Sequence, residues 1–364
     1  MKILFTGGGT MGSVSPLIAI HQQLTKNNQQ KIKDYQVLWL GTRTGPERKI
    51  VEKEGIEFKA IAAGKLRRYF DLRNIIDLAK IKIGFWQAFF IILKFKPDII
   101  LSAGSFVSVP VVWAGWVLRI PSIIHQQDVR PGLANRLMAP FAARITVALD
   151  VSLEDYSKNK TVLAGNPVRQ SLVTSDQSLV MGSEKFEFKN NLPILLVMGG
   201  GTGALKINEL IWESLDELTK FCNVLHLTGK NKNKNYPLLI THYSSQYKPF
   251  EFLTDKMADA YQAADLVVSR AGMSALTELA YLKKPAIVIP IPNSHQEDNA
   301  KYFAQKDACL YLDQRKTSSD QLVKIVRELL RDGNRRRELG ENMHKIFIDY
   351  SGKHIIKEVL RYSA

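Results

Sequence analysis

The sequence predicts an α/β fold made of two doubly wound, Rossmann-like domains that face each other across a cleft. Two glycine-rich turns at matching places in the two halves carry this prediction. The apolar run Lys2–Phe5 leads into the turn at 7–12 (GGGTMG), and Ile194–Met198 leads into the turn at 199–204 (GGGTGA). Each apolar run is typical of a buried parallel strand, and each turn is followed by residues with helical spacing. The repeat of this unit predicts two similar α/β domains.

Further short apolar runs predict more buried strands in both halves. They lie at 37–40, 99–101, 122–124 and 144–147 in the first half, and at 266–268 and 286–289 in the second. Several follow a proline closely: Pro97, Pro121, Pro193 and Pro285. Proline ends the preceding element and cannot donate inside a central ladder, so these positions suit the start of a strand.

The segment Gly165–Arg169 (GNPVR) predicts a hinge between the halves. We therefore expect a first domain over 1–164 and a second over 165–341, a size typical of two-domain chains. A basic helix over about 342–364 is expected to pack back on the first domain.

Composition points to an anionic partner. The net charge is +15, from 50 basic and 35 acidic residues. Such a balance suits a phosphate-bearing substrate, an anionic lipid or nucleic acid, or simply a solvated basic surface. No nucleic-acid-binding signature accompanies it, so nucleic acid is not an expected partner. Cys222 and Cys309 are isolated, which indicates a reduced cytosolic setting and no cysteine metal site.

Residues 65–96 contain eight basic and only two acidic residues, and 83–93 carry no charge at all. Spanning a bilayer takes about 20 apolar residues, so this segment is too short to do so. An apolar helix edged with lysine and arginine can instead lie in the lipid interface. The alternative is an ordinary core helix with a basic outer face.

One helical face of this segment is expected to contact an anionic membrane surface: Ile75, Leu78, Ala79, Lys82, Trp86 and Phe89, with Trp116 extending the patch. Ile76, Ile83 and Phe90 are expected to face a core.

Several motifs occur together, in order along nearly the whole chain: the first glycine loop with Val14–Pro16, 102–110 (SAGSFVSVP), 125–128 (HQQD), 165–169 (GNPVR), 199–204, 270–274 (RAGMS) with Glu278, and 295–300 (HQEDNA). This ordered set resembles the MurG family. The resemblance implies a two-domain GT-B fold and transfer of N-acetylglucosamine (GlcNAc) from UDP-GlcNAc to lipid I, with inversion, giving lipid II of peptidoglycan synthesis. It implies no cofactor or catalytic metal, and peripheral attachment at the cytoplasmic face of the cell membrane.

The second glycine turn is suited to cradle the donor diphosphate, because its N–H groups and the following helix N-terminus favour negative charge. Arg169 at the hinge can add charge-assisted hydrogen bonds. The resemblance implies that Glu278 binds the ribose, that the Leu253 backbone pairs with uracil, and that Gln296 and Asn299 bind the sugar. The expected donor residues are Thr10, Gly12, Asp128, Arg169, Gly201, Thr202, Leu253, Ser274, Glu278, Gln296 and Asn299.

The acceptor diphosphate is expected to bind to Gly8, Gly9, Gly12, Ser13, Gly104 and Ser105. Ser13 stands where the family has a histidine, and a serine cannot take a proton near neutral pH. The family's His-Glu-Gln-Asn reads His125-Gln126-Gln127-Asp128 here. We therefore expect Asp128 or His125 to be the catalytic base. For His125, a place in a buried hydrogen-bond network is the alternative.

Three other functions remain open at this point. One is a related lipid glycosyltransferase, such as a monogalactosyldiacylglycerol synthase. Another is a UDP-GlcNAc 2-epimerase, which has no need of the basic apolar segment. The third is a non-catalytic, membrane-bound sugar-nucleotide binder, suggested by Ser13 and the altered tetrad.

Overall fold

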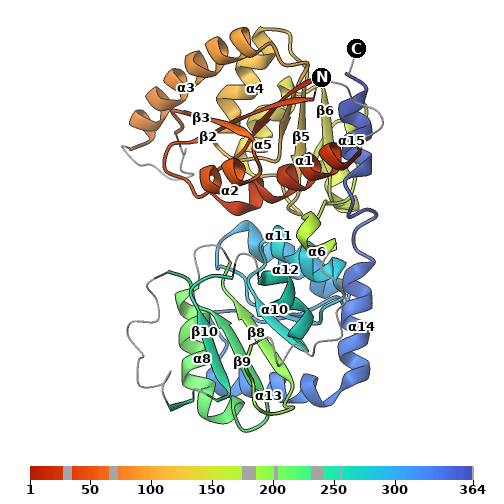
Figure 1. The fold of residues 1–364 in the computed structure, drawn as a ribbon. Coiled ribbons are helices and arrows are strands. Elements are labelled where there is room, and N and C mark those ends of the chain that lie inside the picture. Colours follow the sequence, from red (N-terminus) through yellow and green to blue (C-terminus); the bar gives the residue numbers. More distant parts are fainter. Residues whose placement is uncertain are drawn as a thin grey trace. The chain divides into compact units, whose positions relative to one another are not determined.

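The computed structural model describes residues 1–27, 35–64, 73–173, 186–200, 204–230, 242–243, 245–253 and 256–362. It divides into two compact units. The first comprises Met1–Gln170 with Phe347–Ala364, and the second Ser171–Ile346. Each unit is built around its own parallel sheet with helices on its faces (Figure 1).

The first unit has a seven-stranded parallel sheet in the order β3-β2-β1-β4-β5-β6-β7. Its strands are β1 (Lys2–Thr6), β2 (Gln36–Thr42), β3 (Glu57–Ile61), β4 (Ile99–Ser102), β5 (Ser122–Gln126), β6 (Arg144–Val147) and β7 (Thr161–Leu163). Its helices are α1 (Ser15–Asn27), α2 (Glu47–Lys53), α3 (Arg73–Phe95), α4 (Ser108–Val117), α5 (Leu133–Met138) and α15 (Lys353–Leu360), with 3₁₀ turns η1 (Met11–Ser13), η2 (Ala139–Phe141) and η3 (Asp150–Asp155). The short helix α6 (Gln170–Val173) lies where the units divide.

The second unit has a six-stranded parallel sheet in the order β10-β9-β8-β11-β12-β13. Its strands are β8 (Ile194–Met198), β9 (Asn223–Leu227), β10 (Tyr247–Phe250), β11 (Leu266–Ser269), β12 (Ala286–Val288) and β13 (Leu310–Tyr311). Its helices are α8 (Leu205–Leu218), α10 (Met257–Ala263), α11 (Met273–Tyr281), α12 (His295–Gln305), α13 (Ser319–Arg331) and α14 (Gly333–His344).

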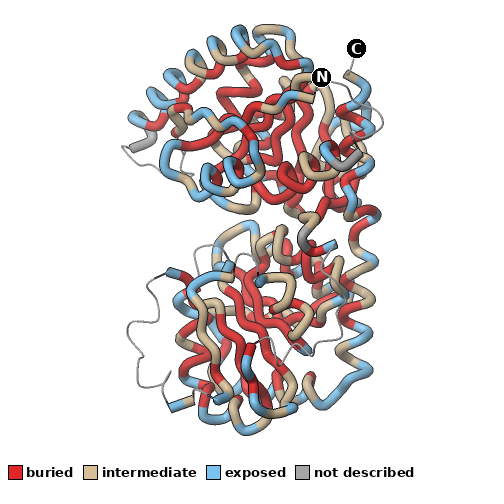
Figure 2. Tube along the Cα trace, in the orientation of Figure 1, coloured by how far each residue is buried: buried red, intermediate tan, exposed pale blue. Residues whose placement is uncertain are grey.

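Both sheets are buried, while the outer faces of the helices are exposed (Figure 2). Every residue of β4 and of β8 is buried, as expected for strands covered by helices on both faces. The predicted fold class is confirmed, and the apolar runs predicted as strands are strands of these two sheets. In each sheet the order reverses beside the strand that precedes a glycine turn, at β1/β4 and β8/β11.

The expected single helix over about 342–364 is wrong, because the chain bends between α14 and α15. Gly352 has a φ of +77°, a left-handed conformation that no helix interior adopts. Before it, the carbonyl oxygens of Asp349 and Tyr350 accept from the N–H groups of Asn166 (3.0 Å) and Val168 (2.9 Å). α15 then buries Ile355 and Val359 in the core around β1.

A neutral hydrogen-bond chain crosses the second unit at His226 of β9. The Trp212 indole donates to the Tyr247 hydroxyl at 2.9 Å, and that hydroxyl lies 3.0 Å from His226 Nδ1. His226 Nε2 lies 3.1 Å from Oδ1 of Asn208, whose amide nitrogen donates to the Thr228 carbonyl. The network therefore assigns the proton to Nε2. Burial lowers the pKa of His226 to about 3.

This lowered pKa predicts a loss of stability in mild acid. The unfolded chain takes up a proton at His226 below pH 6.5, its ordinary pKa, whereas the folded chain does not until about pH 3. Stability is therefore complete above pH 6.5 and falls with pH, by up to about 1.4 kcal/mol per pH unit from this group. Urea unfolding at pH 7, 6 and 5 measures the slope. We expect His226→Gln to be less stable at pH 7 yet to show a shallower slope. Equal slopes in both proteins would contradict the assignment.

Candidate functional site

In each unit the strands are parallel, so the loops after their carboxyl ends gather at one edge of the sheet. Ligands of doubly wound sheets bind at this edge, where the strand order reverses. In the first unit the loops follow β1, β4 and β5, and in the second they follow β8, β10, β11 and β12. Most residues predicted to bind substrate lie in these loops.

Three side chains hold the first glycine loop, at residues 7–13. The Ser13 hydroxyl accepts from Gly8 N at 3.1 Å and lies 3.2 Å from Gly8 O. The Ser105 hydroxyl donates to Gly8 O at 2.6 Å, and Glu47 Oε2 accepts from Gly9 N at 3.1 Å. Ser13 is buried and bonds inside its own loop, so its hydroxyl fixes the loop rather than replacing a basic imidazole.

The loops after β1, β4 and β5 are tied together. Gln127 Nε2 donates to the carbonyl oxygens of Gly12 (2.9 Å) and Ala103 (3.3 Å). Gly104 and Ser105 both have positive φ, +91° and +94°, and so form a tight turn. The structure thus brings together the residues predicted for the acceptor diphosphate, with Thr10 exposed and Gly12 half-buried beside them.

His125 is fully buried on β5, with both ring nitrogens occupied. Nδ1 lies 3.0 Å from the Thr146 hydroxyl, and Nε2 lies 3.0 Å from Oδ1 of Asn166. Burial lowers the pKa of His125 to about 4, so the ring is neutral near pH 7. Neither nitrogen is placed to receive a proton from a substrate. This environment matches the alternative of a buried structural histidine, and we do not retain His125 as a base.

Asp128 is half-buried in the loop that follows β5. Its carbonyl oxygen accepts from Gln126 Nε2 at 2.7 Å. Gln126 Oε1 in turn accepts from the Tyr156 hydroxyl at 3.2 Å and from the amide of Asn135. The glutamine that replaces the family's glutamate thus joins a neutral network that fixes the backbone at Asp128.

In the second unit, α11 and α12 carry several of the polar side chains predicted to bind the donor. Glu278 is buried, and the Tyr261 hydroxyl of α10 donates to its Oε2 at 2.9 Å. Ser274 lies one helical turn before Glu278, and its buried hydroxyl has no hydrogen-bond partner among the described residues. Ser274 and Glu278 are four residues apart and therefore lie on the same face of α11, the helix that begins within the 270–274 motif.

The start of α12 lies against this motif. Asn299 is fully buried, and its Nδ2 donates to the Ala271 carbonyl at 3.0 Å. A Cβ added to Gly272 would lie 4.0 Å from Gln296 Nε2. Ser294 caps the helix by accepting from Gln296 N. Gln296 and Asn299 therefore lie close to the N-terminus of α11.

For four other predicted donor residues, Gly201, Thr202, Leu253 and Arg169, the structure gives less detail. Gly199 and Gly200 follow β8, with Gly200 at a φ of +82°, while Gly201 and Thr202 lie outside the described residues. Leu253 is half-buried after β10. Arg169 is half-buried near the end of Met1–Gln170, the first of the two segments that form the first unit.

The exposed face of α3 is wider than predicted: Leu78, Ala79, Lys82 and Trp86 are exposed as expected, but residues expected in the core are exposed as well. Ile76, Ile83 and Phe90, expected in the core, are 58%, 53% and 62% exposed, while Phe89 is half-buried and packs on the core. The helix faces inward through Ile81, Gly84, Ala88 and Ile92, which are buried; Ala88 and Ile92 belong to the core cluster that includes Leu38 of β2 and Val111 of α4. A Cβ on Gly84 would lie only 2.1 Å from the Ala62 carbonyl oxygen.

The exposed residues on this side are the α3 surface: Ile76, Leu78, Ala79, Lys82, Ile83, Trp86, Phe90 and Leu93, with Trp116 of α4 also exposed. The side chain of Ile75 lies outside the described residues. None of the described helices is long and apolar enough to cross a membrane.

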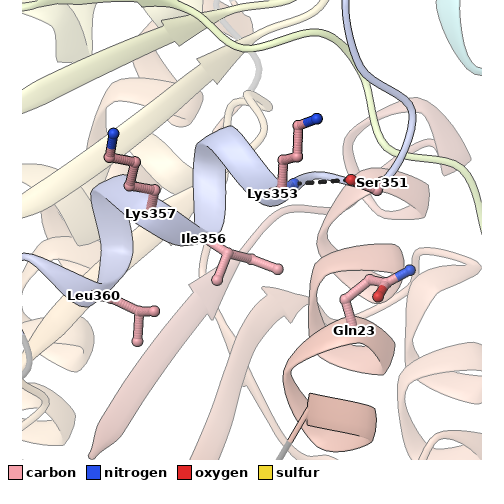
Figure 3. A pocket seen from close by; sticks show the side chains of 6 residues that line it. All are labelled: Gln23, Ser351, Lys353, Ile356, Lys357 and Leu360. Carbon is pink, nitrogen blue, oxygen red and sulfur yellow. Dashed lines mark hydrogen bonds between the residues drawn. The ribbon is translucent and has the colours of Figure 1, made fainter.

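A cavity of about 310 Å³ lies beside α1 and α15 and is lined by Gln23, Ser351, Lys353, Ile356, Lys357 and Leu360. Lys353 and Lys357 point away from Ile356 and Gln23 (Figure 3). None of the residues predicted to bind substrate lines this cavity. Among the described residues, no group of three or more His, Cys, Asp or Glu side chains could hold a metal ion.

Sequence reasoning missed Glu47, Tyr261 and Gln127. Glu47 follows Gly45-Pro46 and looks like an ordinary acidic residue at a helix start. Tyr261 precedes Glu278 by 17 residues, and no local pattern pairs the two. Only the fold places these side chains beside the predicted residues.

Two family descriptions match most of the chain. The N-terminal domain of glycosyltransferase family 28 matches residues 3–147, and its C-terminal domain matches residues 194–356. Together with the paired parallel sheets, these matches define the class: the chain belongs to glycosyltransferase family 28 and has a GT-B fold.

Curated relatives narrow the family further. A Clostridium botulinum UDP-N-acetylglucosamine–N-acetylmuramyl-(pentapeptide) pyrophosphoryl-undecaprenol N-acetylglucosamine transferase is 37% identical over 367 residues, covering 100% of this chain and 99% of the relative. The Clostridium kluyveri transferase of the same name is 40% identical over 290 residues, covering 80% and 79%. The chain belongs to this family, the MurG family.

Solved structures share the fold. Acinetobacter baumannii MurG has a TM-score of 0.72 at 24% identity and covers 99% of both chains. A UDP-GlcNAc 2-epimerase from Neisseria meningitidis has a TM-score of 0.71 at 14% identity, covering 99% of this chain and all of that one. At these identities the likeness concerns fold alone.

Proposed function

We propose that this protein is an N-acetylglucosaminyltransferase that moves GlcNAc from UDP-GlcNAc to lipid I and so forms lipid II for peptidoglycan synthesis. The observation that carries the proposal is the 37% identity with transferases of this name along the whole chain. Two separate glycine turns, one at the switch point of each sheet, support it, because donor and acceptor both carry a diphosphate.

The donor is assigned to the second unit. The turn at 199–204 and the start of α8 offer N–H groups to the diphosphate, where charge gathers as UDP leaves. Glu278 binds the ribose hydroxyls and the Leu253 backbone binds uracil. The remaining donor contacts come from Thr10, Gly12, Asp128, Arg169, Gly201, Thr202, Ser274, Gln296 and Asn299.

The acceptor diphosphate is assigned to the loops with Gly8, Gly9, Gly12, Ser13, Gly104 and Ser105. The acceptor hydroxyl attacks C1 of the donor sugar, the bond from C1 to the phosphate oxygen breaks, and UDP leaves with that electron pair. Attack from the opposite face inverts the anomeric centre. Asp128 takes the proton of the attacking hydroxyl. Its backbone is fixed by Gln126, which supports this role.

The direct test incubates the full chain with labelled UDP-GlcNAc and a lipid I analogue. We expect lipid II, and we expect Asp128→Asn to lower kcat by about 10²- to 10⁴-fold, the usual contribution of a general base. UDP release without lipid II would favour another acceptor or hydrolysis. UDP binding without any turnover would favour a sugar-nucleotide binder, and near-normal turnover of Asp128→Asn would exclude Asp128 as the base.

Tyr261→Phe tests the ribose site. The change removes the donor to Glu278 Oε2, a hydrogen bond to a charged group, so we expect UDP to bind about ten-fold more weakly by calorimetry. Wild type and Tyr261→Phe should bind 2′,3′-dideoxy-UDP with the same affinity, because this compound has no ribose hydroxyls that could donate to the Glu278 carboxylate. Tyr243→Phe is the matched control, since Tyr243 bonds Asp216 at an exposed site. A ten-fold loss that persists with the dideoxy compound would contradict the ribose role.

The α3 surface is assigned to an anionic membrane surface, which makes the protein peripheral at the cytoplasmic face of the cell membrane. Trp86 and Phe90 are 56% and 62% exposed, and Lys82 and Lys94 are exposed on the same helix. Apolar side chains beside cations suit the lipid interface, where each cation adds about 1 kcal/mol.

Replacing both Trp86 and Phe90 with serine tests this surface. We expect binding to vesicles that contain anionic lipid to fall at least ten-fold in a sedimentation assay, because about 2 kcal/mol or more of apolar burial is lost. Ile348→Ser is the control, since Ile348 is 53% exposed outside the α3 surface. Unchanged vesicle binding by the double variant would remove α3 from the membrane contact.

A further inference from the structure

We propose that Glu47 is a positioning residue that sets the conformation of the first glycine loop and thereby the affinity for the lipid-borne diphosphate. This inference rests on the proposed function, because it assumes that this loop receives the acceptor. Glu47 would touch no substrate. It acts through the backbone of Gly9.

Glu47 begins α2 and is completely buried. Its Oε2 accepts from Gly9 N at 3.1 Å, and its Oε1 accepts from Thr42 N at 2.7 Å and from the Thr42 hydroxyl. Thr42 ends β2, and the glycine loop follows β1, its neighbour in the sheet. One carboxylate therefore joins the loop to the end of the adjacent strand.

The glycines nearby leave space for this carboxylate. A Cβ on Gly8 would lie 2.2 Å from Glu47 Oε1, and a Cβ on Gly45 would lie 1.9 Å from Oε2. Both distances are far below van der Waals contact, so an alanine at either position would push the carboxylate away. The buried Glu47 carboxylate is therefore one reason why Gly8 and Gly45 have no side chain, independent of any bound ligand.

No cation among the described residues pairs with Glu47, so only the three donors offset the cost of burying it. Hydrogen bonds to a charged acceptor are stronger than those between neutral groups. The Glu47 carboxylate therefore fixes the direction of the Gly9 N–H firmly. Ser13 and Ser105 hold Gly8 from the other side. A turn that binds an anion through its backbone depends on fixed N–H directions, which these contacts provide.

Glu47→Gln tests the proposal. The glutamine oxygen can still accept from Thr42, but its amide group then faces the Gly9 N–H, so that two donors meet. We expect KM for the lipid I analogue to rise at least ten-fold, while Kd for UDP, which is assigned to the second unit, changes less than two-fold. A general loss of folded protein would not produce this split. Glu52→Gln is the matched control on α2, because Glu52 pairs with Arg48 at the surface.

Hydrogen exchange gives a second readout that needs no activity. In the ligand-free chain, peptides covering residues 7–14 should exchange faster in Glu47→Gln than in wild type or Glu52→Gln. If Glu47→Gln does not fold, Thr42→Val is the second variant; it removes the hydroxyl that donates to Glu47 and accepts from Gly45 N, but it keeps the Thr42 N–H donor, so it should show a smaller rise in both exchange and acceptor KM. Unchanged exchange, or an unchanged acceptor KM in an active enzyme, would overturn the proposal. A wild type that makes no lipid II would instead refute the proposed function. The hydrogen-exchange comparison would then still test whether Glu47 fixes the first glycine loop.

Discussion

The structure depends on backbone N–H groups held in fixed directions at the carboxyl ends of two parallel sheets. In the first unit, Ser13, Ser105 and Glu47 hold the loop after β1. In the second, Asn299 ties the start of α12 to the loop after β11. Loops alone would leave these groups free to reorient, and reorientation would weaken any binding of phosphate. Buried side-chain hydrogen bonds supply the rigidity that function requires.

Charge is distributed in keeping with this arrangement. The excess of basic residues is large, yet the buried networks around His125, His226 and Gln126 are neutral, and the one around Glu47 carries a carboxylate. His125 and His226 are both uncharged, because burial keeps their pKa values near 4 and 3. Gln126, Asn135 and Tyr156 form a further neutral set under Asp128. Each of these networks fixes a loop without a permanent positive charge, whereas the buried Arg270 guanidinium donates to the carbonyl oxygens of Ile289 and Pro290 after β12.

Sequence alone predicted the fold class and eight of the thirteen described strands, because glycine turns after apolar runs are a local signal. It did not predict β3, β7, β9, β10 and β13. It also predicted the segments that gather at the sheet edges. It failed where tertiary packing decides. The inward face of α3 follows from the close approach at Gly84, so Ile76, Ile83 and Phe90 are exposed. The burial of His125 and the contacts of Glu47 and Tyr261 involve partners 17 to 41 residues away, which no local pattern reveals.

The most direct test of the account measures hydrogen exchange of the full chain with and without UDP. The account predicts protection in peptides covering 194–210, 247–257 and 270–300, because these carry the turn after β8, the uracil loop and the ribose and sugar residues. Peptides covering 99–110 should be unaffected by UDP. Protection of the first glycine loop without protection of the second unit would contradict the assignment of the nucleotide to the second sheet.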